Sequence, residues 1–259
     1  MRDTTPELYG ELQVDEGAGM ATDFTDIGFP ITSHRESIPF AQRVMNEGTQ
    51  HRAAGGLYVE WAPGAGVRLW VVVTPKAKFG RIDRDFVPEC STPLKITGRL
   101  PDAGQMTGYM TALADMGFPL VFSVPDYRAW DSLSLPVDAR IGLVGFARGD
   151  LSAYASDEAH ATETRGKPAL AAEAFISSGL ILPDGAPRTP PTDDAIVSGH
   201  VVATETRVNP VTGLSFIWAR IETLGVTLEV VADPQHVPNQ LTVGGIVSAA
   251  LALSGRPIA

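Results

Sequence analysis

The chain has 259 residues, of which 44% are apolar, and a formal net charge of −10 at pH 7. This length and apolar content predict a globular protein with a sizeable hydrophobic core. The 30 acidic residues outnumber the 20 Lys and Arg residues, and no basic cluster interrupts them. Because nucleic acids and anionic membranes both bind basic surfaces, this balance argues against either as a partner.

Cysteine content and the amino-terminal residues bear on the cellular compartment. Cys90 is the single cysteine, so it cannot form an internal disulfide, which fits a reducing compartment. The first 19 residues carry acidic side chains where a signal peptide has an apolar stretch. Since no run of about 18 apolar residues follows either, we expect a cytoplasmic protein.

The 26 glycines and 20 prolines, together with short runs of Val, Ile and Leu, favour strands and turns over long helices. Residues 1–53 are polar and irregular, with a short helix expected within 37–48. Residues 57–61 and 67–73 are strand-like and are joined by a turn at 63–66, which predicts a β-hairpin. Trp61 and Trp70, in its two strands, are expected to anchor a core.

Three segments of the chain recur later in the same order, which is typical of a duplicated unit. The matched pairs are 96–100 with 197–201, 112–124 with 220–232, and 137–149 with 243–255. Gly117 and Gly225 coincide in this alignment and lie between apolar runs, where a turn with positive φ needs glycine. The segment 244–256 could be helical by itself, but its glycine-containing counterpart favours a strand for both copies.

A unit of this length, with a Gly-containing first strand, a hairpin, a connector and a closing strand, resembles the OB-fold, a five-stranded Greek-key barrel. Gly98 with Gly199 and Gly149 with Gly255 are its recurrent positions. SH3-like and other small barrels share this strand rhythm. Residues 194–234 also resemble uncharacterised bacterial proteins of no known activity.

The fold prediction is therefore mainly β, with two small OB-like or similar β-barrels and an N-terminal β extension. Ser156, followed by two acidic residues, predicts a helix start between the barrels. The predicted units are an N-terminal irregular segment and hairpin (1–92), a first barrel with a helical connector (93–183), a Pro-rich linker (184–194) and a second barrel (195–259).

No catalytic or metal-binding signature is found in the sequence, and no cofactor is predicted. The tetrapeptide DEAH (157–160) has no accompanying phosphate-binding loop. The five histidines lack ligand spacing, and Cys90 lacks a neighbour that would lower the pKa of its thiol. Asp83 and Asp85 alternate with arginines, which predicts a solvated edge strand.

Two aromatic groups are the candidate binding residues. Tyr127, Arg128 and Trp130 crowd a connector of the first barrel, where they could stack on a planar ligand or plug the barrel mouth. On a later strand, Phe216 and Trp218 alternate with an apolar set. We assign that set to the barrel interior and the two aromatic residues to its outside, against a neighbouring domain or a partner. The apolar set is Ile217, Ala219 and Ile221.

These patterns predict a non-catalytic binding or scaffolding protein that engages a protein partner. One alternative is an enzyme whose site lies between the domains and is assembled from residues distant in sequence. A second alternative, single-stranded nucleic-acid binding, rests on fold analogy alone.

Overall fold

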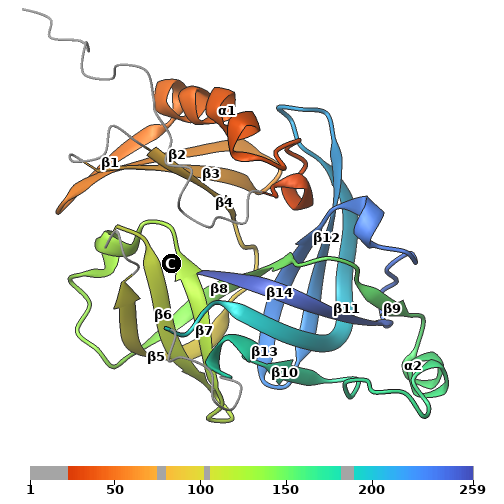
Figure 1. The fold of residues 1–259 in the computed structure, drawn as a ribbon. Coiled ribbons are helices and arrows are strands. Elements are labelled where there is room, and N and C mark those ends of the chain that lie inside the picture. Colours follow the sequence, from red (N-terminus) through yellow and green to blue (C-terminus); the bar gives the residue numbers. More distant parts are fainter. Residues whose placement is uncertain (1–22, 75–79, 102–105, 182–189, 259) are drawn as a thin grey trace, which may run out of the picture.

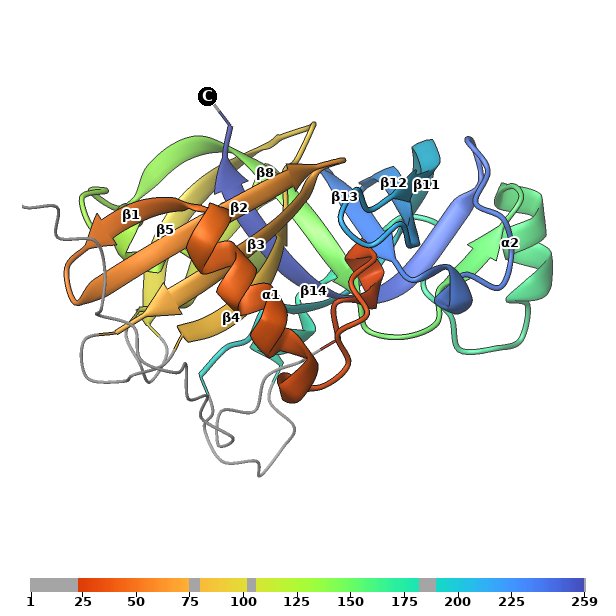
Figure 2. The same ribbon diagram turned by 90° about the horizontal axis from the view of Figure 1, so that it is seen from above.

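A four-stranded sheet carrying one helix lies against a closed β-barrel (Figure 1). The computed structural model describes residues 23–74, 80–101, 106–181 and 190–258. Viewed from above, helix α1 lies over the four-stranded sheet (Figure 2). The sheet therefore carries α1 on one face and the barrel below the other, and the barrel residues Phe146 and Phe216 also join the apolar cluster on the α1 side.

The four-stranded sheet has the order β1-β2-β3-β4, with every neighbouring pair antiparallel. Its elements are α1 (His34–Glu47), β1 (Thr49–Ala53), β2 (Gly56–Gly64), β3 (Val67–Val73) and β4 (Gly80–Phe86). A capping box between Ser33 and Glu36 fixes the start of α1. The predicted helix and the predicted hairpin are both confirmed, and β1 and β4 extend the hairpin on its two sides.

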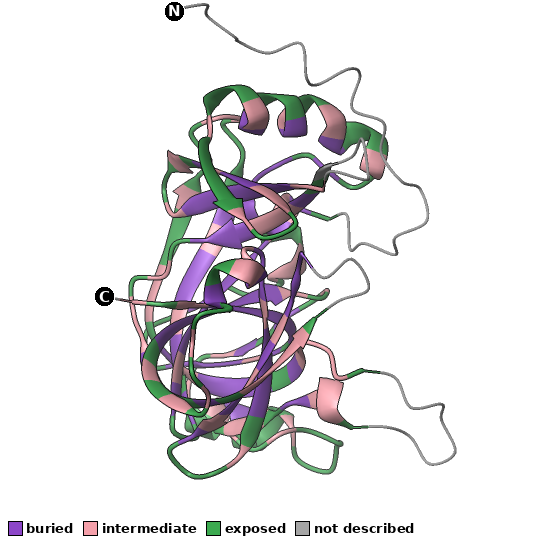
Figure 3. Cartoon of the chain, turned by 90° about the vertical axis from the view of Figure 1, so that its left-hand side faces the viewer, coloured by how far each residue is buried: buried purple, intermediate pink, exposed green. Residues whose placement is uncertain are grey.

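Strand β3 shows how the sheet separates its two faces. Leu69 and Val71 belong to the apolar cluster that includes residues of α1, whereas Trp70 and Val72 face the other way. Trp61 and Trp70 are both buried, as predicted for core anchors. Figure 3 shows the same division on α1, whose outer side is exposed and whose inner side is buried.

The barrel closes through eight strands in the order β11-β12-β13-β8-β5-β6-β7-β14, with β14 pairing back to β11. Its strands are β5 (Thr92–Pro101), β6 (Gly108–Ala114), β7 (Pro119–Val124), β8 (Val137–Ala147), β11 (Asp194–Val208), β12 (Ser215–Thr223), β13 (Val226–Ala232) and β14 (Ile246–Pro257). The mainly β prediction is confirmed, including a strand near the carboxyl end. The pair of OB-like barrels stays a prediction.

The long strands β8 and β14 connect the two halves of this barrel. The first part of β8 pairs with β5, and its last part runs parallel to β13. The first part of β14 pairs with β11, and its last part meets β7. In addition, β8 and β14 pair with each other, antiparallel, over residues 141–145 and 253–257.

The remaining elements are short and lie at turns and edges. They are η1 (Thr25–Ile27), η2 (Tyr127–Trp130), β9 (Ser152–Tyr154), α2 (Asp157–Glu163), β10 (Ala174–Ile176), η3 (Ser178–Leu180) and η4 (Pro234–His236). The Ser156 hydroxyl accepts a hydrogen bond from the Ala159 amide, which confirms the predicted helix start. Gly117 and Gly225 have φ of 79° and 63°, as their predicted turns require.

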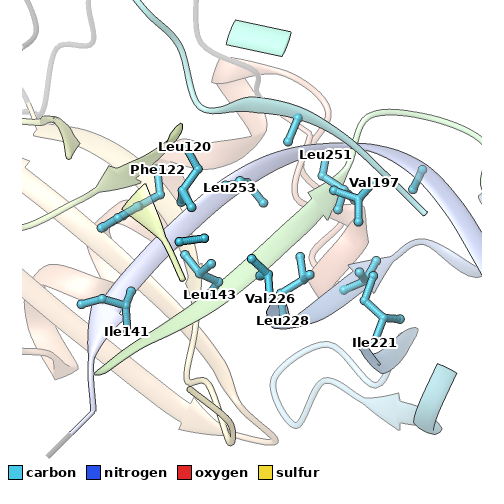
Figure 4. Close-up of a cluster of buried hydrophobic side chains, with 14 of the residues drawn as sticks. Leu120, Phe122, Ile141, Leu143, Val197, Ile221, Val226, Leu228, Leu251 and Leu253 are labelled. Carbon is cyan, nitrogen blue, oxygen red and sulfur yellow. The ribbon is translucent and has the colours of Figure 1, made fainter. Parts of the chain in front are cut away.

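The barrel interior is apolar (Figure 4). Phe122, Leu143, Ile221 and Leu253 come from four different strands and are almost completely buried in one cluster. Because these side chains fill the barrel, it has a packed core that sets the positions of its ends and outer surface.

Two expectations from the sequence concern the Pro-rich linker and membrane-spanning helices. Of the predicted linker 184–194, residues 184–189 lie outside the described residues, and β11 begins at Asp194. The described helices include none with the length and apolar character needed to cross a membrane.

Candidate binding site

A buried carboxylate joins the four-stranded sheet to the barrel. Asp85 in β4 is 1% exposed and accepts hydrogen bonds from Trp70 Nε1 (3.1 Å), Ser254 Oγ (3.1 Å) and Arg256 Nε (3.0 Å). Arg68 Nη1 lies 3.4 Å from the same carboxylate. Strand β4 is an edge strand, as predicted, but the predicted solvation is wrong at Asp85, because the end of β14 covers it.

The ion-pair network continues from Asp85 into the barrel. Arg256 stacks 4.5 Å from the Trp70 ring centroid, and its Nη2 lies 3.0 Å from Asp126 Oδ1. Burial raises the pKa of Asp126, and the charge of Arg256 opposes that shift. Three consecutive charged groups thus fasten the sheet to the barrel, with Arg256 shared between two carboxylates.

A cavity of about 170 Å³ lies among β4, the start of β6, the ends of β7 and β8, and Ala252 in the middle of β14. Three guanidinium groups line it, together with two aspartates and several polar or aromatic side chains. We call it the arginine cavity; its lining includes Arg81, Arg84, Arg148, Asp83, Asp193, Tyr109 and Ser123. In a chain with a net charge of −10, three arginines are thus brought together, each with a carboxylate partner.

The three arginines are held to different degrees. Arg81 Nε lies 2.6 Å from Asp83, and Arg84 Nε lies 3.0 Å from Asp26. Arg84 also lies over two aromatic rings, 4.8 Å from the centroid of Phe146 and 5.7 Å from that of Phe24. These contacts fix the Arg84 guanidinium firmly in the wall of the cavity.

Arg148 is held more loosely, by longer ion pairs. Its Nη2 lies 3.4 Å from Asp194 and 3.9 Å from Asp193, and its side chain is 36% exposed. Burial raises the pKa of Asp193, while Arg148 and the Ser123 hydroxyl act in the opposite direction. Because a guanidinium has five N–H donors, Arg148 can also bind an anionic group that enters the cavity.

A second cavity, of about 280 Å³, shares Arg84 and Arg148 with the first. Its lining includes Asp23, Asp26, Asp233 and His236. We call it the Asp26 cavity. His236 Nδ1 lies 2.8 Å from Asp150 Oδ1. Arg84 and Arg148 therefore line both cavities, and in the Asp26 cavity three aspartates lie around them.

Of the predicted binding residues, the connector group lies in η2 and is largely buried. Tyr127 and Trp130 are 4% and 5% exposed, and Trp130 belongs to the barrel core cluster. Arg128 is half-buried, with its Nη1 3.2 Å from Asp131. The Tyr127 ring packs closely on Gly108, which lines the arginine cavity, so Tyr127 supports that cavity from behind.

Phe216 and Trp218 lie on the outer face of the barrel, as predicted, in the apolar cluster that includes the four-stranded sheet. Both are buried, and Trp218 Nε1 donates to Glu229 Oε2 at 2.8 Å. Glu229 is completely buried and also accepts hydrogen bonds from the amides of Glu89 and Cys90. This group therefore secures the segment between β4 and β5, and it belongs to a different cluster from Trp130.

Other residues considered from the sequence lie apart from the cavities. Cys90 is half-buried, and burial next to Glu229 raises the pKa of its thiol to about 12. His160 of the DEAH sequence is 7% exposed and packs edge-on against the Tyr154 ring. Within the described ranges, no three His, Cys, Asp or Glu side chains are grouped to hold a metal ion.

Sequence reasoning missed Arg84, Arg148, Asp26 and Asp193. One signal pointed to this region: Arg68 and Asp85 are cross-strand partners in the β3–β4 register, and opposite charges favour such positions. The cavities themselves left no local pattern, because their lining residues come from positions 23 to 252. Comparisons with protein-family models, curated proteins and solved structures found no match.

Proposed function

We propose that this protein is a non-catalytic binding protein and that its protein partner inserts a carboxylate into the arginine cavity. The observation that supports this proposal is the convergence of Arg81, Arg84 and Arg148 on one cavity in an acidic chain. Arginine is suited to this task, because its planar N–H groups match the two oxygens of a carboxylate.

The arrangement also favours a defined binding position over general attraction. Arg84 is fixed by its ion pair and by the two rings beside it, whereas Arg148 has only the longer ion pairs. A carboxylate can therefore meet one rigid and one adjustable guanidinium. The Ser123 hydroxyl and the ring of Tyr109 line the same cavity and add polar and stacking contacts.

Isothermal titration calorimetry with N-acetyl-glutamate amide tests the proposal, with N-acetyl-glutamine amide as the uncharged probe. From the usual binding energy per ligand atom, we expect a Kd on the order of 1 mM for the charged probe. The uncharged probe should bind at least tenfold more weakly, because it lacks the charge-assisted hydrogen bonds.

Arg148→Gln should weaken the preference for the charged probe, since Arg148 is the arginine of the cavity with the longest ion pairs. Arg165→Gln is the matched control, because Arg165 is an exposed arginine outside both cavities. Equal binding of the two probes to the unmodified protein, or an unchanged preference in Arg148→Gln, would contradict the proposal.

A second candidate function is catalysis at the same junction, and one contact favours it. His236 lines the Asp26 cavity and is oriented by Asp150, as a general base is oriented by a carboxylate. If this function is correct, hydrolysis of p-nitrophenyl acetate should be detectable and should be lost in His236→Gln. Hydrolysis that is unchanged in His236→Gln would exclude this histidine as the base.

For the fold, we propose that the barrel consists of two duplicated OB-like units that share their closing strands. In support, β5-β6-β7 and β11-β12-β13 are both antiparallel meanders, and each is followed by a 3-10 turn and a long strand. Each long strand pairs with the first strand of its own unit and with the third strand of the other. Superposition of the two units in an experimental structure tests this duplication.

A further inference from the structure

The Asp26 cavity has features that the proposed carboxylate site does not use. Asp26 is 5% exposed, and its Oδ2 lies 3.0 Å from Arg84 Nε. Its other oxygen, Oδ1, is also buried and has no hydrogen-bond partner among the described residues. Buried carboxylate oxygens are nearly always hydrogen-bonded, so an unsatisfied one beside a cavity indicates a missing donor.

The charges around Asp26 show which kind of donor fits. Asp23 and Asp233 line the cavity with it, and both raise the pKa of Asp26 further. Burial is the largest cause of this shift, which brings the pKa to about 7, and Arg84 and Arg148 oppose it. A positively charged donor would therefore relieve both the unsatisfied oxygen and the repulsion among the aspartates.

The geometry further distinguishes between two kinds of cationic donor. A guanidinium binds a carboxylate best through both oxygens, but Arg84 already occupies Asp26 Oδ2. An ammonium group is a compact charge with three N–H donors and can bind a single oxygen. Oδ1 of Asp26 is thus matched to an ammonium group.

We propose that the Asp26 cavity binds an alkylammonium group, supplied by a small primary amine or by a lysine side chain. The site shares Arg84 and Arg148 with the arginine cavity, but the proposal does not require that a carboxylate binds there. Asp26 accepts a hydrogen bond from the ammonium through Oδ1, and Asp23 and Asp233 contribute negative charge. Arg84 keeps Asp26 in position from the opposite oxygen.

Calorimetric titration with propylammonium chloride at pH 8 tests the proposal, with 1-propanol as the neutral probe of similar size. We expect a Kd on the order of 1 mM for propylammonium, in line with the binding energy per atom of very small ligands, and no measurable binding of 1-propanol. Nα-acetyl-lysine amide distinguishes the sources: tighter binding than propylammonium indicates a lysine side chain, and weaker binding indicates a free amine.

Asp26→Asn should weaken propylammonium binding by about tenfold or more, the loss expected for a charge-assisted bond. Asp115→Asn is the matched control, because Asp115 is exposed in the β6–β7 turn, outside the cavity. Asp233→Asn, which leaves the Asp26–Arg84 ion pair in place, should also weaken propylammonium binding but keep the binding of N-acetyl-glutamate amide, which separates this proposal from the carboxylate site. Unchanged propylammonium binding in Asp26→Asn would overturn the proposal.

A second measurement needs no substitution at Asp26. With a pKa of about 7, Asp26 is about nine-tenths ionised at pH 8 and about one-tenth at pH 6, so propylammonium should bind about tenfold more weakly at pH 6. His236 faces the same cavity, but the pH dependence is assigned to Asp26. His236→Gln should therefore keep most of the pH dependence, and its complete loss in that variant would contradict the role of Asp26.

Discussion

Replacing Asp85 tests whether its ion-pair network holds the sheet to the barrel. Asp85 is 1% exposed, and its carboxylate oxygens accept hydrogen bonds at 3.0 to 3.4 Å from side-chain donors of four residues, Trp70, Ser254, Arg68 and Arg256. In Asp85→Asn, one oxygen becomes an N–H group that faces cationic donors. The Arg68 and Arg256 side chains, 10% and 15% exposed, then lose one of the two carboxylates that compensate each of them, and Arg68 keeps Glu60 at 3.2 Å.

We therefore expect Asp85→Asn to lower the free energy of unfolding by about 3–5 kcal/mol, the cost of removing one partner of a buried ion pair. Arg256 keeps its contact with Asp126, which places the expected loss toward the lower value. Urea unfolding followed by tryptophan fluorescence measures the change, because Trp70 donates to this carboxylate.

Asp138→Asn is the matched control, since Asp138 is an exposed aspartate in β8. It should change the free energy of unfolding by less than about 0.5 kcal/mol, as surface substitutions usually do. A loss below about 1 kcal/mol in Asp85→Asn would refute the reasoning, because it would mean that solvent or another group compensates the two arginines.

Three further predictions concern the core, the pH dependence of stability and nucleic acids. In urea unfolding, Trp218→Ala should lower the free energy of unfolding by about 3–5 kcal/mol and Ile217→Ala by about 1 kcal/mol, because Trp218 is buried and Ile217 is only half-buried. A larger loss in Ile217→Ala than in Trp218→Ala would refute this. Burial raises the pKa of Asp26 to about 7, so the folded chain keeps a proton that the unfolded chain loses near pH 4. As pH rises from about 4 to about 7, the free energy of unfolding of the unmodified protein should therefore fall by up to about 4 kcal/mol relative to that of Asp26→Asn, with no further fall above pH 7. Parallel curves of unfolding free energy against pH for the two proteins would contradict this assignment. Fluorescence anisotropy with a labelled single-stranded oligonucleotide should show negligible binding at physiological salt, given the net charge of −10; submicromolar, salt-dependent binding would refute it.

Local features of the fold could be predicted because their causes are local. Short apolar runs on either side of a Pro- and Gly-containing turn marked β2 and β3, and Gly117 and Gly225 marked turns whose positive φ only glycine adopts easily. The Ser156 cap marked the start of α2. In each case the residues that determine the structure lie within a few positions of it, so a single sequence carries the signal.

The long-range pairing could not be predicted in the same way. The end of β8 runs parallel to β13, more than 80 residues away, and the end of β14 covers Asp85. The same alternation of Arg and Asp fits an exposed edge strand and a buried ion-pair network equally well. The same holds for Ile217. The alternation of residues along β12 predicted that its side chain faces the barrel interior, but its half-burial depends on neighbours that are distant in sequence.

The distribution of buried charge leads to a last prediction about the junction. The barrel core is apolar, whereas Asp26 and Arg84 are a buried pair at the junction, beside both cavities. Replacing a buried ion pair with apolar residues of similar size is often neutral or stabilising by about 1–4 kcal/mol. If the pair is kept for binding, Asp26→Leu combined with Arg84→Met should unfold at an equal or higher urea concentration and should no longer bind propylammonium. Asp26→Leu alone is the control, and it should be less stable than the double variant because it leaves Arg84 unpaired. A double variant that is destabilised by more than about 2 kcal/mol would show instead that the pair is needed to hold the sheet on the barrel.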